Sequence, residues 1–179
     1  MQLVKTELNG LFIIENLILS DNRGAFIKTM NFDFFNGNDL EVDFKEYYFS
    51  ISNKNVIRGM HFQVPPSDHA KLVYVIKGAI IDVVLDIRTE SKTFGSFFST
   101  ELNDINRKSI YISKGFAHGF LSLTDETIVM YHQTSGYNKF CDMGILYNSF
   151  GMNWDVLGPI VSERDQQFPI LQDFNSPFK

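Results

Sequence analysis

Residues 56–78 concentrate side chains that can move a proton or hold an anion. This stretch contains His61 and Lys71, with Arg58 and Gln63 close to them in sequence. A histidine has an ordinary pKa of about 6.5 and can accept a proton near neutral pH. A lysine ammonium can stabilise a negative oxygen that forms beside it where water is scarce. Together these residue types predict proton abstraction next to a carbonyl group, through an enolate.

Two predicted strands carry these side chains. Residues 56–62 alternate in the manner of an extended chain, which places the side chain of His61 on one defined face. Residues 71–77 alternate again and stop at Gly78, which indicates a hairpin turn into the next strand. Lys71 is therefore expected to point the same way as His61 from a neighbouring strand.

Two residues further along the chain fit the same chemistry. Tyr131, in the segment TIVMYHQT, can return a proton to the opposite face of the substrate, and Asp165 can fix the tautomer of His61 and stabilise its imidazolium. Each also has a simpler interpretation when taken alone. Tyr131 is then an ordinary barrel aromatic, and Asp165 belongs to a capped turn that begins at Ser162. The residues by themselves favour these simpler interpretations.

The spacing of strand and turn signals predicts an all-β fold. Short extended segments recur at roughly 8–12-residue spacing, with Gly, Pro and Asn between them, which is typical of an antiparallel jelly-roll sandwich or barrel. No repeat or linker interrupts the chain, so one domain over residues 1–179 is expected, with short helical turns at 31–40 and 162–165. The expected strands cover residues 11–19, 25–30, 41–52, 56–62, 71–77, 79–86, 93–102, 109–113, 116–123 and 127–134.

The composition limits the classes of function. Of the 179 residues, 44% are apolar, 18 are Phe and one is cysteine, Cys141, and the net charge is −5. This acidic balance argues against a nucleic-acid partner, and a single cysteine excludes an internal disulfide or a cysteine-based zinc site. No run approaches the roughly 20 apolar residues of a membrane-spanning helix, and residues 1–10 lack a signal pattern. We expect a cytoplasmic protein without membrane partners.

A jelly roll with histidines on facing strands raises the possibility of a cupin, a barrel that often holds a metal through three histidines and a glutamate. Here Gln63 stands at the second histidine position and Lys71 at the glutamate position, while His118 keeps the last histidine. A protonated lysine has no lone pair to donate and repels a cation. We therefore expect a cupin-like barrel without a metal, and a metal-dependent oxygenase is disfavoured.

Seven segments of the chain, taken together, resemble one family of nucleotide-sugar epimerases, the dTDP-4-dehydrorhamnose 3,5-epimerases. The segments are, in chain order, RGMHFQ, KLVYVIKG, DVVLDIR, TFG, GFAHGFLSL, MYHQTSGY and SERD. The resemblance implies a cupin jelly roll that forms a homodimer and needs no metal or organic cofactor. It also implies an isomerase that inverts C3 and C5 of a nucleotide-activated 4-keto-6-deoxyhexose, an activity of dTDP-rhamnose and cell-surface polysaccharide biosynthesis.

The resemblance also implies roles for single residues. His61 becomes the general base, Asp165 its partner, Tyr131 the proton donor and Lys71 the cation that stabilises the enolate. The residues that match ligands of the sugar, the diphosphate or the nucleotide are Arg23, Arg58, His118, Tyr137 and Arg164.

The chain departs from the family pattern at several recognition positions. Lys28 and Asp142 each stand where a glutamate is usual, and Glu46-Tyr47-Tyr48 replaces Gln-Asp-Asn. The catalytic set is intact, so these departures bear on substrate identity rather than reaction type. We count Lys28, Tyr47, Tyr48, Gln63 and Asp142 among the candidate substrate-binding residues.

Two alternatives to a 3,5-epimerase stay open. One is a single-carbon epimerase or ketoisomerase that acts on a differently activated deoxysugar. The other is a non-catalytic cupin that only binds a sugar nucleotide, in which Tyr131 and Asp165 have no reason to accompany His61 and Lys71.

Overall fold

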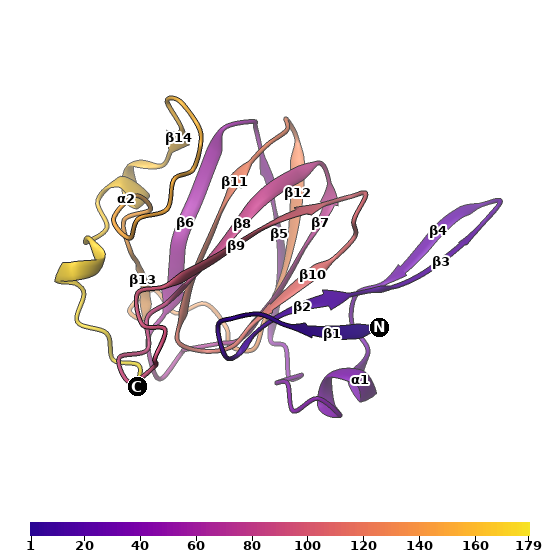
Figure 1. Ribbon diagram of the computed structural model, residues 1–179, viewed down its shortest axis with the longest axis horizontal. Helices are drawn as coiled ribbons and strands as arrows, with labels where there is room; N and C mark the ends of the chain where they lie inside the picture. Colours follow the sequence, from indigo (N-terminus) through magenta and orange to yellow (C-terminus); the bar gives the residue numbers. More distant parts are fainter.

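Two mainly antiparallel sheets face each other and form a jelly-roll sandwich (Figure 1). The structure is a computed structural model that describes residues 1–179. The first sheet consists, in spatial order, of β1 (Gln2–Lys5), β2 (Leu11–Glu15), β10 (Ser109–Ile112), β7 (Lys71–Lys77), β12 (Thr127–Gln133) and β5 (Glu46–Ser52). The second consists of β13 (Asp142–Gly144), β6 (Val56–Gln63), β11 (Phe116–Ser122), β8 (Ala79–Asp86) and β9 (Phe97–Asn103), with β14 (Ile160–Val161) beside β6. The all-β jelly-roll prediction is confirmed.

Several predicted boundaries were wrong. Residues 11–19 form two strands, β2 and β3 (Leu17–Asp21), because the Asn16 side chain between them donates hydrogen bonds to Arg107 O and Ser109 Oγ. The predicted helical turn at 31–40 is limited to α1 (Phe32–Asn36), and the strands predicted at 41–52 and 93–102 begin only at β5 and β9. The strands β1, β13 and β14 were missed because each is too short to show a period.

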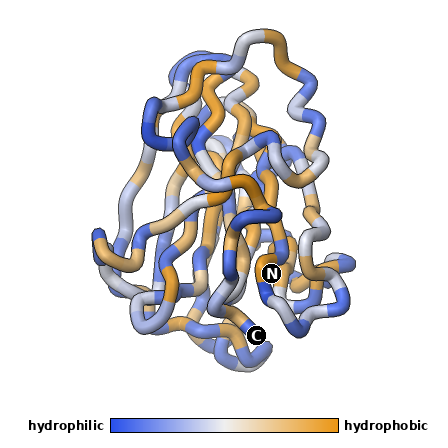
Figure 2. The backbone as a smooth tube through the Cα atoms, turned by 90° about the vertical axis from the view of Figure 1, so that its left-hand side faces the viewer, coloured by the Kyte–Doolittle hydropathy of each residue, from blue (hydrophilic) through white to orange (hydrophobic).

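The main apolar core lies between the two sheets. Strands alternate their side chains between two faces, so each sheet supplies its inward-facing Val, Ile, Leu and Phe residues to a common cluster. This cluster has 14 buried residues, including Val73 from β7, Val84 from β8, Phe120 from β11 and Val129 from β12. The tube in Figure 2 is mostly hydrophobic where strands cross the middle of the molecule and mostly hydrophilic at the turns.

Both outer faces of the sandwich are partly covered. The C-terminal segment, which contains α2 (Glu163–Gln166) and the 3-10 turn Leu171–Asp173, runs over the second sheet (Figure 1). It packs Trp154 and Phe178 into a second cluster with Ile57 and Leu121. The α1 segment covers the first sheet with Phe35, which lies in a third cluster. The C-terminal segment is therefore held against β6.

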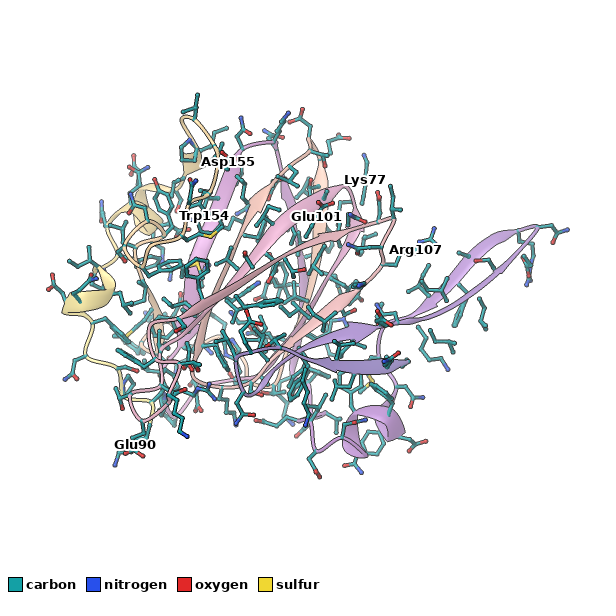
Figure 3. The ribbon with its side chains drawn as sticks, in the orientation of Figure 1. Lys77, Glu90, Glu101, Arg107, Trp154 and Asp155 are labelled. Carbon is teal, nitrogen blue, oxygen red and sulfur yellow. The ribbon has the colours of Figure 1, made fainter.

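The hairpin of β3 and β4 (Gly24–Lys28) projects away from the sandwich (Figure 1). The two ends of the sandwich are polar, with Lys77 and Arg107 at one end and Glu90 at the opposite end (Figure 3). No helix is long and apolar enough to cross a membrane.

Candidate active site

His61 and Asp165 form a hydrogen-bonded pair at the edge of a cleft. Nε2 of His61 lies 2.9 Å from Oδ1 of Asp165, and Oδ2 of Asp165 accepts a hydrogen bond from the Gly59 N–H at 3.1 Å. Because a carboxylate can only accept, the imidazole carries its proton on Nε2 and keeps the Nδ1 lone pair as a base. The His61 side chain is 32% exposed and that of Asp165 only 4%, so the base is accessible and its partner is enclosed.

The C-terminal segment delivers Asp165 to this position. β14 runs parallel to the start of β6 and brings α2 alongside it. The Ser162 hydroxyl then caps α2 by accepting a hydrogen bond from the Asp165 N–H at 3.1 Å. Burial alone would raise the pKa of Asp165, but hydrogen bonds from His61 and Gly59 outweigh it and hold this pKa below its usual value. Asp165 is therefore ionised and can stabilise a positively charged His61.

Gly59 allows β6 and β11 to come unusually close beside this pair. Its φ of 135° lies in the region that favours glycine, and a Cβ at this position would lie 2.5 Å from Gly119 Cα. The β6–β11 register pairs His61 with His118 and shifts between His118 and Phe120. The two histidines therefore sit on adjacent strands.

Lys71 begins β7 and is 7% exposed. Its Nζ donates a hydrogen bond to the His61 carbonyl oxygen at 3.2 Å, which leaves two of its three N–H groups for a substrate oxygen. Burial lowers the pKa of Lys71 to about 8, a shift that the charges of Asp142 and Asp82 oppose. Lys71 does approach His61, but the prediction of a neighbouring strand was wrong, because β7 belongs to the first sheet and β6 to the facing one. The amine is still charged at neutral pH.

Tyr131 faces the same space from the first sheet. Its hydroxyl lies 3.3 Å from Ser50 Oγ, and its ring stacks on Tyr48 with centroids 4.8 Å apart. Burial raises the pKa of Tyr131 well above its usual value. The hydroxyl therefore stays protonated and can serve as a proton donor.

An inner compartment of about 300 Å³ joins these groups. Arg58 borders it and is fixed by hydrogen bonds from its guanidinium to Ser52 Oγ and Ile51 O. His118 borders it as well, and its Nε2 lies 2.8 Å from Oδ2 of the fully buried Asp82. The lining residues are Tyr48, Ser50, Arg58, His61, Lys71, His118, Gly119, Phe120 and Tyr131.

An outer compartment of about 510 Å³ adjoins the inner one, since Tyr48, His61 and Lys71 line both. Arg164 lies at its edge, 2.7 Å from the carboxylate of Asp142. Several predicted recognition residues come together here. The lining residues are Glu46, Tyr47, Tyr48, His61, Phe62, Gln63, His69, Lys71, Gln133, Tyr137, Asp142 and Arg164.

The amide of Gln63 is already occupied by a loop of the protein. Its Nε2 donates to Ser67 O at 2.9 Å and to Gly136 O at 3.1 Å, and its Oε1 accepts from the Asn138 N–H at 2.6 Å. Gln63 therefore holds the loop that carries Tyr137, and a direct contact with substrate stays a prediction.

Two predicted ligands do not reach the cleft within one chain. Arg23 lies in the turn of the projecting β3–β4 hairpin, where its side chain is 86% exposed and bonds to Asp21. Lys28 ends β4 in the same hairpin. Neither residue lines the inner or the outer compartment.

Sequence reasoning missed several contributors to the site. Asp82 supports His118, Ser50 contacts Tyr131, and Glu46 and Gln133 line the outer compartment. Asp82 carried a usable signal, because a carboxylate between Ile80 and Val84 falls on an inward-facing strand position. Gln133 carried none, since polar residues at strand ends are common, whereas Glu46 belongs to the Glu46-Tyr47-Tyr48 departure but was not counted as a ligand. No three His, Cys, Asp or Glu side chains converge in a way that would hold a metal ion.

Comparisons with known proteins match one family over nearly the whole chain. The sequence model of the dTDP-4-dehydrorhamnose 3,5-epimerases matches residues 5–173. The chain is 41% identical to the dTDP-4-dehydrorhamnose 3,5-epimerase of Methanothermobacter thermautotrophicus, over 95% of this chain and 94% of the relative.

Solved structures give the same result. The crystal structure of the dTDP-4-dehydrorhamnose 3,5-epimerase of Elizabethkingia anophelis NUHP1 superposes with a TM-score of 0.92, at 34% identity, over 98% of this chain and 99% of that one. The dTDP-6-deoxy-D-glucose-3,5-epimerase of Legionella pneumophila, in complex with dTDP-4-keto-L-rhamnose, has a TM-score of 0.92 at 30% identity, over 97% of this chain and 94% of that one. The chain therefore belongs to the dTDP-4-dehydrorhamnose 3,5-epimerase family, as the seven sequence segments indicate.

Proposed function

We propose that this protein inverts C3, C5 or both in a 4-keto-6-deoxyhexose that is activated by a nucleoside diphosphate. One observation carries the proposal above the others. A histidine base from the second sheet and a tyrosine acid from the first sheet, His61 and Tyr131, line the same inner compartment with the buried cation Lys71. Inversion at a carbon requires a base and an acid on opposite faces, and two facing sheets provide them.

The first half of the reaction removes a proton from the carbon beside the C4 ketone. Nδ1 of His61 takes the proton, and the electron pair of the C–H bond moves into the carbonyl to form an enolate. Asp165 stabilises the resulting imidazolium through Nε2–H. The free N–H groups of Lys71 bind the enolate oxygen, which is worth most in a compartment with little water.

The second half returns a proton to the other face. The Tyr131 hydroxyl gives its proton to the carbon while the enolate reverts to the ketone. Solvent then returns a proton to the Tyr131 phenolate and takes the abstracted proton from the His61 imidazolium, so that both groups regain their starting states. One proton leaves and one arrives, so the reaction needs no electron transfer. Inversion at the second carbon repeats the same steps after the sugar has shifted in the compartment.

The outer compartment suits the nucleoside diphosphate. Arg164 supplies a cation, and guanidinium groups bind phosphate oxygens through paired hydrogen bonds. Tyr47 and Tyr137, 59% and 63% exposed, offer aromatic faces to a base. The Legionella relative binds dTDP-4-keto-L-rhamnose, which supports a dTDP sugar as the first substrate to test.

A homodimer would complete the site. The hairpin exposes Leu19 and Phe26 at 57% and 58%, and the edge strand β5 exposes Phe49 and Ile51 at 60% and 55%. Such apolar surface favours a second copy of the chain. A hairpin that crosses to the partner would carry Arg23 and Lys28 to the partner's cleft, which lies next to β5.

The expected cytoplasmic location fits a single buried, unpaired Cys141.

The direct test incubates the protein with dTDP-4-keto-6-deoxyhexoses in deuterated water and follows each carbon by NMR. Deuterium at C3, C5 or both, together with the inverted sugar, is the expected result. The panel also includes UDP, GDP and CDP sugars, because Lys28, Tyr47 and Tyr48 depart from the family pattern at positions expected to bear on substrate identity. If none of these substrates exchanged a proton for deuterium, the proposal would be contradicted.

A further inference from the structure

Tyr48 stands at the junction of the two compartments. It is one of the residues that line both, with His61 and Lys71. The family pattern that this sequence resembles has an asparagine where this chain has Tyr48. An aromatic ring at this point has far more contact surface than an amide, so Tyr48 makes contacts in the cleft that an asparagine would not.

The ring of Tyr48 lies flat against the ring of Tyr131. Their centroids are 4.8 Å apart with an angle of 15° between planes, and the β5–β12 register places the two residues directly opposite each other. The edge of His118 contacts Tyr131 with centroids 6.3 Å apart. The Tyr131 hydroxyl itself has one hydrogen-bond partner, Ser50 Oγ, at 3.3 Å. Tyr48 therefore supplies one flat face for the Tyr131 ring, which also packs in the main core cluster.

Tyr48 is itself held by a chain of hydrogen bonds. Its hydroxyl donates to Gln133 Oε1 at 3.1 Å, and Gln133 Nε2 donates to Glu46 Oε2 at 2.8 Å. Glu46 Oε1 accepts from the Tyr137 N–H at 3.0 Å. Burial and the charges of Glu46 and Asp142 raise the pKa of Tyr48 to about 12, so its hydroxyl keeps its proton and this chain stays intact at neutral pH.

We propose that Tyr48 is a positioning residue for the return of the proton. It acts through Tyr131, by holding that ring so that the hydroxyl faces the carbon from the side opposite His61, and the inference thus rests on the proposed function. Abstraction by His61 does not use this stack. Loss of the stack should therefore slow protonation from the Tyr131 face and leave abstraction intact, so that more enolates take a deuteron back from His61 without inversion.

The experiment measures this partition in Tyr48→Leu and Tyr48→Phe. In deuterated water, deuterium in recovered substrate reports abstraction and return on the His61 face, whereas inverted product reports protonation by Tyr131. We expect Tyr48→Leu to lower the ratio of inversion to exchange by about three- to tenfold, the range that an aromatic pair can contribute. Tyr48→Phe keeps the stack and should stay within about twofold of the wild type.

Two controls separate positioning from folding. Tyr147→Leu makes the same change in the cluster on the outer face of the second sheet, where Tyr147 packs on Trp154, and should leave the ratio unchanged. A second measurement needs no substrate: NMR of ring-labelled tyrosine should show faster flipping of the Tyr131 ring in Tyr48→Leu than in the wild type or Tyr48→Phe.

Several outcomes would overturn the inference. An unchanged ratio in Tyr48→Leu, or equal losses of exchange and inversion with an unchanged Tyr131 flip rate, would overturn the positioning role. A rise in KM alone would mean that Tyr48 only shapes the compartment and would also overturn it. A wild-type protein that exchanges no proton would refute the proposed function first, and the inference with it.

Discussion

The predicted functional residues of the inner compartment and of the β3–β4 hairpin differ in their surroundings: the former are bonded inside a cleft, whereas Arg23 in the hairpin is exposed to solvent. In the inner compartment, His61, Lys71 and Tyr131 each have a partner within the same chain. In the hairpin, Arg23 is 86% exposed and bonds only to its neighbour Asp21. The proposed catalytic groups therefore lie together in one chain, whereas Arg23 would reach a cleft only in the proposed dimer. Chemistry and recognition are expected to respond differently to mutation and to dilution.

The largest effect should come from the centre of the inner compartment. His61→Asn removes the base, so both deuterium exchange and inversion should fall by about 10³-fold or more, within the range of acid–base catalysis. Nuclear magnetic resonance in deuterated water measures both. Thermal unfolding serves as the control, because His61 also bonds to the enclosed Asp165 and its replacement therefore affects stability as well. Exchange at the wild-type rate would remove His61 from the mechanism.

A smaller and more selective loss is expected on the opposite face. Tyr131→Phe removes the proton donor and keeps the ring stack, so inversion should fall by about 10²-fold or more while exchange continues. The measurement compares deuterium in recovered substrate with deuterium in product. Equal losses of exchange and inversion would show that the two roles are not divided between the two sheets.

The pH dependence should show the buried state of Lys71. Its pKa of about 8 means that the ammonium needed for the enolate is lost as pH rises through this value, so kcat/KM should fall about tenfold by pH 9. Lys71→Arg keeps its charge at this pH and should flatten the alkaline fall, at a lower overall rate. An identical alkaline limb in both proteins would assign the fall to another group.

Lys71 should change stability and activity in opposite directions as the pH rises. Its folded pKa lies below the unfolded value of about 10.4, so the unfolded chain binds more protons between these two pH values. The contribution of Lys71 to the free energy of unfolding should therefore rise with pH across this window, while activity falls. Denaturant titrations of wild type and Lys71→Met at pH 7.5 and pH 9.5 check this.

The smallest effect belongs to the hairpin. Arg23→Ala should raise KM by up to about fivefold and leave kcat unchanged, because exposed charge contacts are weak. Lys5→Ala, which removes a charge from β1 at the far edge of the first sheet, is the matched control. If dilution to the monomer raises KM in the wild type but not in Arg23→Ala, the hairpin acts across the dimer. A change in kcat alone would argue against this division of labour.

The sequence predicted the inner compartment well because regular strands obey simple rules. Alternation put His61 and Lys71 on two strands, and the structure brings the Lys71 amine to the carbonyl oxygen of His61, although from the facing sheet rather than from a neighbouring strand. The approach of Tyr131 and Asp165 required sheet pairing across more than 60 positions of sequence, which no local pattern encodes. Their roles came from family resemblance, and their assignment to catalysis stays a prediction that the geometry supports.

The outer compartment was harder to predict for a physical reason. Its walls combine strand ends with the loop that carries Tyr137, and the position of this loop depends on side-chain hydrogen bonds such as Gln63 to Asn138 and Glu46 to Tyr137. An amide can equally well bind a ligand or a backbone group, so residue type alone did not show that Gln63 holds a loop. Short strands such as β14 were missed for the same reason, because their pairing partner decides their conformation.

The C-terminal segment has a consequence for when the protein becomes active. This segment covers the second sheet with Trp154 and Phe178 and also supplies Asp165 to His61. The segment follows strands β1 to β13 in the chain, so these strands leave the ribosome before Asp165 does. Docking of the segment both buries apolar surface and brings the carboxylate to His61. Folding of this face and completion of the proposed base are thereby coupled.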